Sequence, residues 1–421
     1  MSKPIIFQSQ NNIRVSNQIA LIESLKDGPK SITNLAKEMS LSYTALVKII
    51  DELSSNGLLY VTQDLSCKKR KNAKGRKPVL VSLNSKEGVV CAIDLSRRDI
   101  SICLADLSNR IIVRDSLEDV AIITSKTLDR VVQKVKKLLA LPEAEGLPLL
   151  SICISSPGKI DKTTGAYIYA PKIANAEQVN LPSFLKSHFG VDVYIYNDVN
   201  LGLVGEKSFG CIPKDAQDVL FAFCDMTSGS GLMLNGQLYE GFNGFAGEFA
   251  HYHSVDELSK KSRSGKLYTV GEIYLDIKES IENKPDHPLY GKRRYHLKEV
   301  VSLFNNGDPI VVAAVTKSAK FNAIEFLAIT NLLDLQYIVL EGRIIEFGEA
   351  YKNLLNKYFK GYDANHNRAE ILFSTLNNDA NLLGAVFQGT NMYLLERFGE
   401  MTRKRTSTPE YDVIQYFGNN V

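Results

Sequence analysis

The chain has 421 residues, of which 44% are hydrophobic and 23% charged, as is usual for folded globular proteins. Its net charge of +3 is small, so an affinity for nucleic acid has to come from local clusters of basic residues. Six scattered cysteines without a CxxC pair exclude a disulfide framework, and no apolar run is long enough to span a bilayer, so we expect a soluble, cytoplasmic protein of two or three domains.

Three helical patterns open the chain. An apolar stripe predicts a helix over about residues 12–26, which stops at Gly28. Ser31 and Ser42 are the expected N-caps of two further helices, and Gly57 ends the second of them. Two short helices joined by a tight turn are typical of a helix-turn-helix, whose second helix reads DNA. The exposed first turn of that helix offers these DNA contacts: Ser42, Tyr43, Thr44 and Lys48.

A basic loop follows between the two strand-like runs LLYVTQ and VLVSLN. A basic run on its own is typical of a solvated loop. Directly after a helix-turn-helix it predicts a wing whose tip contacts DNA phosphates or the minor groove. The expected DNA contacts of the wing are Lys68, Lys69, Arg70, Lys71 and Arg76. We therefore predict a winged helix-turn-helix DNA-binding domain over residues 1–84.

The region after Val89 has a different pattern. VVCAIDLSRRDISICLADLSNRIIV predicts a three-stranded meander, followed by a helix at about 125–140 and the buried strand LLSICIS. A short helix near 181–188 leads to the strand VDVYIYNDVN, which ends at residues 197–200. Strands that alternate with helices indicate α/β architecture.

The following region repeats this opening. VLFAFCDMTSGSGLMLNGQLY predicts a second pair of hairpins, with TSGSG as the connecting loop. A helix at about 310–333, the strand YIVLEG and further helix to about residue 398 complete the chain. Similar strand–loop–strand openings at Asp94 and Asp225 predict an internal duplication that forms two lobes with a cleft between them.

An ordered set of motifs resembles one protein family. The winged helix-turn-helix, GRKP at 75–78, SSPGKID, YNDVN, TSGSG and GFAGEFAH follow the order seen in the ROK family of repressors, open reading frames and sugar kinases. The similarity covers nearly the whole chain, and the order is far more specific than any single motif. It implies an α/β fold in which the winged helix-turn-helix precedes an actin-like, ribonuclease H-like two-lobed sugar-kinase fold. The first lobe would span 85–200, joined by a C-terminal helix at 380–400, and the second would span 201–379.

The resemblance also implies a sugar site. A sugar presents hydroxyls that donate and accept, so its site needs carboxylates and amides together with glycines that allow close backbone approach. The expected sugar contacts are Asn197, Asp198, Glu248, His251, Glu272 and Gly229. In the family's kinases the aspartate that corresponds to Asp198 is the general base. The family usually has glycine where this chain has Ala250. Without the resemblance, Asn-Asp after a strand is equally typical of a turn or a helix cap.

The family's zinc site is missing from the sequence. Its cysteine-rich run falls on residues 263–272, where the three cysteine positions hold Arg263, Gly265 and Val270. None of these side chains binds zinc, so we expect neither a metal nor another cofactor. We expect apolar packing by Leu267, Tyr268 and Val270 to hold the segment instead, with Glu272 at the position of the family's sugar-contacting glutamate.

The nucleotide-binding elements are also degraded. A phosphate cradle needs glycines whose backbone N–H groups surround the anion. The loop DLSRRD at 94–99 has no glycine, and VLEGRII at 339–345 has one, whereas TSGSG keeps its two. We therefore predict that the chain is not an enzyme.

These observations predict a sugar-responsive transcriptional repressor. As a homodimer or tetramer it would present winged helices to the half-sites of a palindromic operator, and sugar binding would close the cleft and change their spacing. Two alternatives are a regulator controlled by a protein partner and an ATP-dependent sugar kinase, and activation rather than repression stays open. No membrane association is expected, and the sequence does not identify the sugar.

Overall fold

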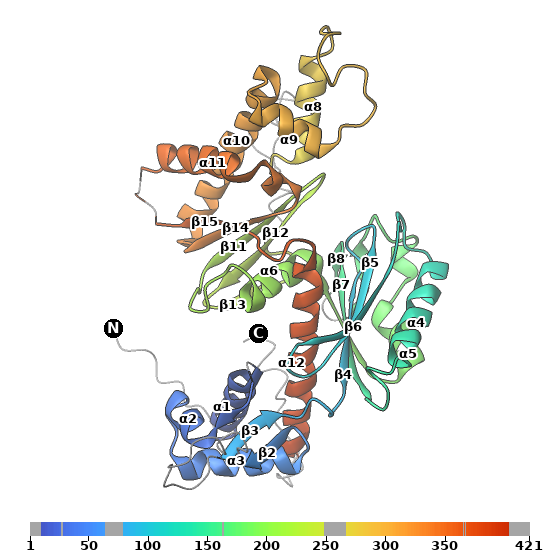
Figure 1. Ribbon diagram of the computed structural model, residues 1–421, viewed down its shortest axis with the longest axis vertical. Helices are drawn as coiled ribbons and strands as arrows, with labels where there is room; N and C mark the ends of the chain where they lie inside the picture. The colour runs from blue at the N-terminus through green and yellow to red at the C-terminus, as the bar shows by residue number, and fades with distance from the viewer. Residues whose placement is uncertain are drawn as a thin grey trace, which may run out of the picture. The chain divides into compact units, whose positions relative to one another are not determined.

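The computed structural model describes residues 10–26, 28–63, 79–161, 164–247, 267–364, 366 and 368–403. The chain divides into two compact units (Figure 1). The first unit comprises Met1–Ile154, Leu181–Ile195 and Val386–Asn420, and the second comprises Ser155–Asn180 and Tyr196–Ala385. One helix, α12 (Ala380–Arg403), begins in the second unit and ends in the first. Among the described helices, none is long and apolar enough to cross a membrane.

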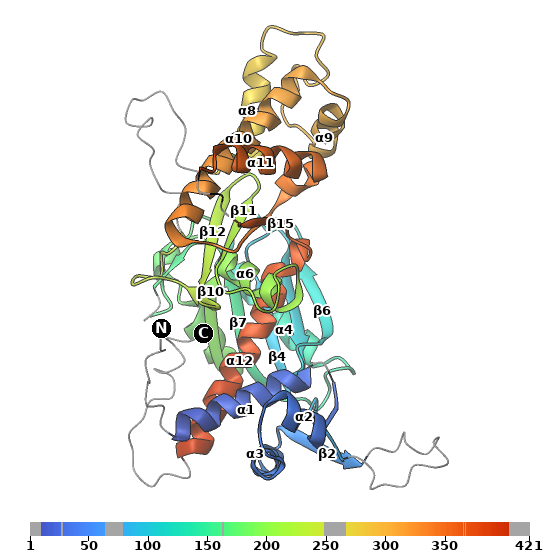
Figure 2. The same cartoon turned by 90° about the vertical axis from the view of Figure 1, so that its left-hand side faces the viewer.

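The N-terminal part of the first unit is a winged helix (Figure 2). Its elements are α1 (Gln10–Lys26), β1 (Lys30–Ser31), α2 (Ile32–Glu38), α3 (Tyr43–Ser55), β2 (Leu59–Gln63) and β3 (Val79–Leu83). The strands form an antiparallel sheet in the order β1-β3-β2. Both predicted N-caps are confirmed, because Ser31 Oγ accepts from Asn34 N and Ser42 Oγ accepts from Ala45 N, each at 3.2 Å.

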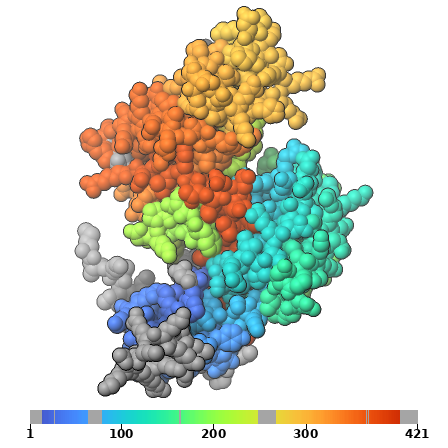
Figure 3. Space-filling view, viewed as in Figure 1, coloured from blue at the N-terminus to red at the C-terminus, as the bar shows by residue number. Residues whose placement is uncertain are grey.

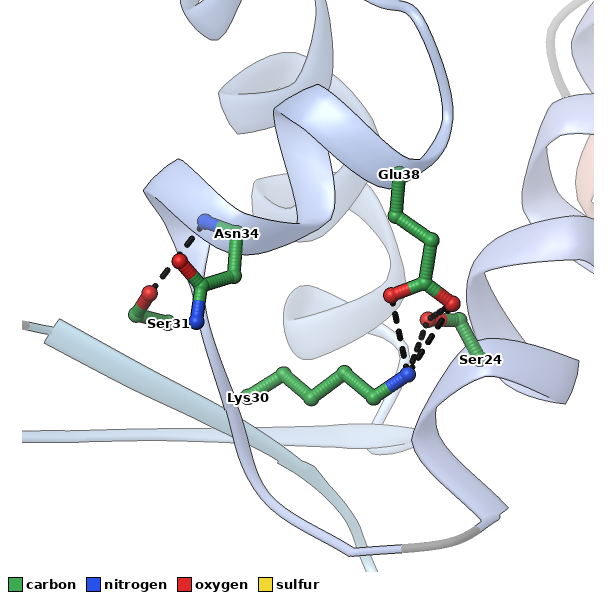
Figure 4. A network of polar contacts seen from close by, with 5 residues as sticks. All are labelled: Ser24, Lys30, Ser31, Asn34 and Glu38. Carbon is green, nitrogen blue, oxygen red and sulfur yellow. Dashed lines mark hydrogen bonds and ion pairs between the residues drawn. The ribbon is translucent and has the colours of Figure 1, made fainter.

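A polar network ties α1 to α2 (Figure 4). Lys30 Nζ donates to both carboxylate oxygens of Glu38 at 2.9 Å, and Ser24 Oγ donates to the same carboxylate at 2.8 Å. Beneath it, Leu35 of α2 and Leu46 of α3 are fully buried in the core of the domain. The network and the core together hold α2 and α3 in the helix-turn-helix arrangement, with the first turn of α3 exposed.

Two five-stranded sheets form the rest of the fold. The strands of the first are β4 (Val89–Asp94), β5 (Ile100–Ala105), β6 (Ile111–Leu117), β7 (Leu149–Ser156) and β10 (Asp192–Asn197), in the order β10-β7-β4-β5-β6. The strands of the second are β11 (Val219–Cys224), β12 (Ser228–Leu234), β13 (Gln237–Tyr239), β14 (Tyr337–Glu341) and β15 (Glu370–Phe373), in the order β13-β12-β11-β14-β15. Numbered along the chain and read from β6 and from β13, both orders are third, second, first, fourth, fifth, which supports the predicted internal duplication.

Helices follow the later strands of both sheets. They are α4 (Ser125–Leu139), α5 (Leu181–Phe189), α6 (Asp198–Phe209), α8 (Val270–Ser280), α9 (Leu297–Asn305), α10 (Pro309–Leu333), α11 (Gly348–Tyr362) and α12. A small hairpin of β8 (Lys159–Ile160) and β9 (Tyr167–Tyr169) belongs to the second unit. In that unit α8 and α9 form the surface at one end, yellow to orange in Figure 3.

Two expectations about elements were wrong. TSGSG is not a loop, because Ser228–Gly231 pair with β11 as the start of β12 and the turn is only residues 225–227. The region expected to be helix up to about residue 398 contains β15, which pairs in parallel with β14. The short run EILF cannot be assigned from its own periodicity, because four apolar-rich residues fit a strand and a helical turn equally.

Candidate functional site

Asn197 and Asp198 lie where β10 passes into α6. Asn197 is the N-cap of α6, since its Oδ1 accepts from Val199 N at 3.0 Å and from Asn200 N at 3.3 Å. Its Nδ2 donates to the Gly158 carbonyl at 3.2 Å. Asn197 is therefore a helix cap, and its contact with a sugar stays a prediction. Asp198 is the first helical residue, where a negative charge is favoured by the helix dipole.

Tyr167 is a buried neighbour of Asp198 that the sequence reasoning missed. Its hydroxyl shares a hydrogen bond with Ser156 Oγ, at the end of β7. Burial raises the pKa of Tyr167 well above its ordinary value, and the negative charge of Asp198 raises this pKa further. The phenol therefore stays protonated and able to donate at neutral pH. Its only sequence signal was an aromatic residue in the run YIY.

Glycines allow β12 to approach the first turn of α6. A Cβ at Gly229 would lie 2.8 Å from Val199 Cγ2, and one at Gly231 would lie 2.9 Å from Asn200 Oδ1. Both distances are too short for real contacts, so a side chain at either position would force Val199, Asn200 or the strand to shift. The structure thus places Gly229 beside the turn that carries Asn197 and Asp198.

The loop that leads to Glu248 is held against the same strand. Ser230 Oγ donates to the Gly247 carbonyl, and Gly247 has a φ of +84°. A Cβ at Gly247 would lie 2.6 Å from the Ser230 carbonyl oxygen. In the same loop the ring of Phe245 lies 5.1 Å from Lys159 Nζ of β8, a cation–π distance. The strand β12 therefore contacts both the first turn of α6 and the loop before Glu248, as far as Gly247.

Several predicted site residues lie outside the described residues. They are Glu248 and His251 of the sugar site, Lys68, Lys69, Arg70, Lys71 and Arg76 of the wing, and Arg263 and Gly265 of the former zinc run. Their roles stay predictions.

Apolar packing does hold the described part of the former zinc run, from residue 267 onward. Leu267 and Val270 are buried in the core of the second unit. Tyr268 N donates to Asn322 Oδ1 at 2.6 Å, and the Tyr268 carbonyl accepts from Ser318 Oγ at 2.9 Å. The expected packing of Leu267, Tyr268 and Val270 is confirmed. Hydrogen bonds between two side chains of α10 and the Tyr268 backbone hold the segment as well.

Glu272 lies in the first turn of α8. Thr269 caps this helix by accepting from Glu272 N at 3.3 Å. Val270 N donates to the Asp225 carbonyl at 2.8 Å, so the start of α8 contacts the turn that leads into β12. The helix that carries Glu272 thus begins at the hairpin that carries Gly229, and the contact of these two residues with a sugar stays a prediction.

Side-chain hydrogen bonds fix the conformation of the loop expected at the phosphate position. Asp94 Oδ1 accepts from Ser96 N at 3.0 Å, and Arg98 Nε donates to Asp119 Oδ1 at 2.8 Å. Asp119 N in turn donates to Asp99 Oδ1 at 2.9 Å. Side chains, rather than free backbone N–H groups, thus set the shape of this loop.

The expected DNA-reading surface is exposed. Ser42, Tyr43, Thr44 and Lys48 are all exposed on the first turns of α3, and Tyr43 is 54% exposed. Two further exposed side chains on β2, Tyr60 and Val61, were missed by the sequence reasoning. Their sequence signal was weak, because an apolar residue in a strand is more often buried.

The model of the ROK family matches residues 90–388, more than half of the chain. The chain belongs to the ROK family. A xylose repressor from Bacillus spizizenii is 26% identical over 376 residues, which cover 88% of this chain and 94% of that protein.

Two solved structures show the same fold. One is described as a ROK family transcriptional regulator and homologue of the Escherichia coli MLC protein, with a TM-score of 0.75 and 20% identity over 92% of this chain and 100% of that chain. The other is a ROK family glucokinase from Streptomyces griseus in complex with glucose and AMPPNP, with a TM-score of 0.58 and 20% identity over 72% of this chain and 100% of that chain. The α/β fold predicted for the chain is confirmed.

Proposed function

We propose that this ROK protein is a sugar-responsive transcriptional repressor. The observation that carries the proposal is the combination, in one chain, of an exposed DNA-reading helix and a carboxylate at the start of α6, while the loop at 94–99 lacks the glycines of a phosphate cradle. The similarity to a xylose repressor over most of both chains supports this combination of roles.

The winged helix binds the operator in this proposal. Exposed hydroxyl and amino groups on the first turns of α3 contact bases and phosphates, and the basic residues at 68–76 contact phosphates. A homodimer or tetramer would present two such helices to the half-sites of a palindrome.

The effector is a sugar or sugar derivative. Asp198 and Glu248 accept hydrogen bonds from its hydroxyls, His251, Asn197 and Glu272 complete the polar set, and Gly229 lies beside the turn that carries Asn197 and Asp198. A single carboxylate hydrogen bond to a sugar hydroxyl is worth about 1.5–3 kcal/mol, so a few of them give specificity.

A kinase is the second candidate. The shared fold with a glucokinase and the retained Asp198 favour it. The glycine-free loop at 94–99 disfavours it, because its backbone N–H groups cannot cradle the β- and γ-phosphates as glycines do. We therefore propose a regulator without enzymatic activity.

The test is a thermal-shift screen of the full chain against xylose, glucose, N-acetylglucosamine and their phosphates, with ATP–magnesium alongside. A ligand at 100 times its Kd adds about 2.7 kcal/mol of stability. A shift with one sugar and none with ATP supports the sensor. A shift with ATP, followed by ADP release, favours the kinase, and no shift with any sugar favours a protein partner.

A further inference from the structure

We propose that α12 positions the DNA-binding domain and carries the effector signal to it. The inference rests on the proposed function and adds the route by which the sugar site acts on the winged helix. Four groups of contacts lie along α12, from its first turns to its last.

The last turns of α12 complete the core of the winged helix. Leu394, Phe398 and Met401 are buried, and Phe398 is fully so. They belong to the same core cluster as Leu21 and Leu25 of α1 and the reading-helix residues of α3. The winged helix therefore lacks a closed core of its own, because residues near 400 supply one side of it.

Polar contacts fix the helix against α1 and α3. Lys26 Nζ donates to Asn391 Oδ1 at 3.2 Å and lies 4.5 Å from the ring centroid of Phe387. Burial lowers the pKa of Lys26, and its ion pair with Glu23 at 2.6 Å opposes this change. Arg397 donates to the Asn56 carbonyl, at the C-cap of α3, at 3.4 Å. A buried lysine is costly without its partners, so these contacts favour one position of α1 on α12.

The middle of α12 packs closely on the first five-stranded sheet. A Cβ at Gly389 would lie 2.7 Å from Val90 Cγ1 and 2.9 Å from Cys153 Cβ. Ser151 Oγ donates to the Gly389 carbonyl at 3.1 Å. The helix is thus clamped to the sheet of the first unit before it reaches the winged helix.

The first turns of α12 cross α6 in backbone contact. A Cβ at Gly384 would lie 1.9 Å from the Leu201 carbonyl oxygen, and one at Gly205 would lie 2.1 Å from the Ala380 carbonyl oxygen. At these two points the backbones of the helices touch directly, with no side chain between them. The helix that starts at Asn197 and Asp198 therefore displaces the start of α12 whenever its own first turns move.

These contacts make a continuous path from the effector site to the reading helix. A sugar held by Asp198 stabilises one placement of α6, and α12 converts this placement into a placement of α1 and α3. The effector acts through its different affinity for the two placements, and the operator responds by the same factor.

The decisive variant is Gly384→Ala, because it touches neither effector nor DNA. Gly361→Ala is the matched control, since Gly361 is a helical glycine of α11 with nothing within 4 Å of an added Cβ. For the full-length wild type and both variants, we would measure Kd for a duplex selected by the wild type from a random library. Each Kd would be measured without and with saturating amounts of whichever of xylose, glucose or N-acetylglucosamine shifts melting.

We expect the sugar to change the wild-type duplex Kd by about 5–150-fold. Gly361→Ala keeps this ratio, whereas Gly384→Ala brings it close to one while still binding the sugar and the duplex separately. An unchanged ratio in Gly384→Ala would overturn the inference. If that variant fails to fold, Asn391→Ala decides in its place, because it removes only the hydrogen bond between Lys26 and Asn391. It should lower the ratio while leaving both separate affinities unchanged, and an unchanged ratio would overturn the inference. A wild type that binds no sugar would refute the proposed function itself, which is a separate result.

Discussion

The two five-stranded sheets share one strand order but differ in the turn after their first strand. After β4, the loop of residues 95–99 has no glycine, and Arg98 forms an exposed ion pair with Asp119. After β11, the turn of residues 225–227 leads into Gly229 and Gly231, which admit α6. At this turn, therefore, glycines allow close approach near the candidate sugar site, whereas the loop expected to hold phosphate has none.

The turn after the fourth strand is alike in both sheets. Gly158 follows β7 with a φ of +107°, and Gly342 follows β14 with a φ of +93°. A Cβ would lie 2.4 Å from the Tyr169 carbonyl oxygen at the first and 2.5 Å from the Cys224 carbonyl oxygen at the second. These two glycines are explained by packing alone, so neither argues for a bound nucleotide.

The largest expected effect tests this shared turn. Gly158→Ala and Gly342→Ala each combine a left-handed backbone with a backbone clash, and we expect each to lower the free energy of unfolding by about 2–4 kcal/mol. Denaturant melts measure the loss, with Gly361→Ala as the control that changes stability little. A loss below about 1 kcal/mol at both positions would show that the turns adapt and are not required by packing.

The next prediction tests the difference between the halves. Asp198→Asn removes a charged acceptor from the half that keeps its glycines, and we expect sugar affinity to fall by about 10–100-fold, or 1.5–3 kcal/mol. Duplex binding without sugar stays unchanged. Asp119→Asn in the other half, where the carboxylate is 78% exposed, is expected to leave sugar affinity alone. Titration calorimetry measures both, and equal losses would remove the distinction.

A smaller effect is expected at Tyr167. Tyr167→Phe removes the hydrogen bond to Ser156 and costs about 1 kcal/mol at neutral pH. Because the pKa of Tyr167 is higher in the folded state, the folded chain binds more protons above about pH 10, and stability falls as the pH rises there. The variant should show a shallower fall than the wild type in melts between neutral and high pH. If stability falls equally with pH in the wild type and the variant, titration of Tyr167 does not contribute to the fall.

The smallest effect is expected at the altered loop. Arg98→Ala breaks an ion pair whose side chains are 66% and 78% exposed, and such pairs contribute about 0–1 kcal/mol. Neither sugar affinity nor the response to ATP–magnesium should change. A thermal shift with ATP in this variant would mean that Arg98 alone blocks a working phosphate site, and the kinase would return as a candidate.

Local signals in the sequence determined much of the fold. Ser31 and Ser42 were recognisable as caps, and the apolar spacing of Leu46, Ile49 and Leu53 placed the buried face of α3. Such signals join residues within about four positions of one another, so they need no knowledge of the folded chain. The order of the motifs was enough to indicate the family, which the match over 90–388 then established.

Contacts between distant segments were decided only by the tertiary structure. The pairing of β15 with β14, the burial of Tyr167 beside Ser156 and the place of Phe398 in the core of the winged helix have no local signature. Phe398 lies more than three hundred residues from the helices it packs against. The amphipathic pattern of its own helix indicates that Phe398 is buried, but it does not indicate which residues cover it. The sequence by itself therefore determined the elements and the family. The fold determined that the last turns of α12 complete the core of the winged helix, because only folding decides which apolar faces meet.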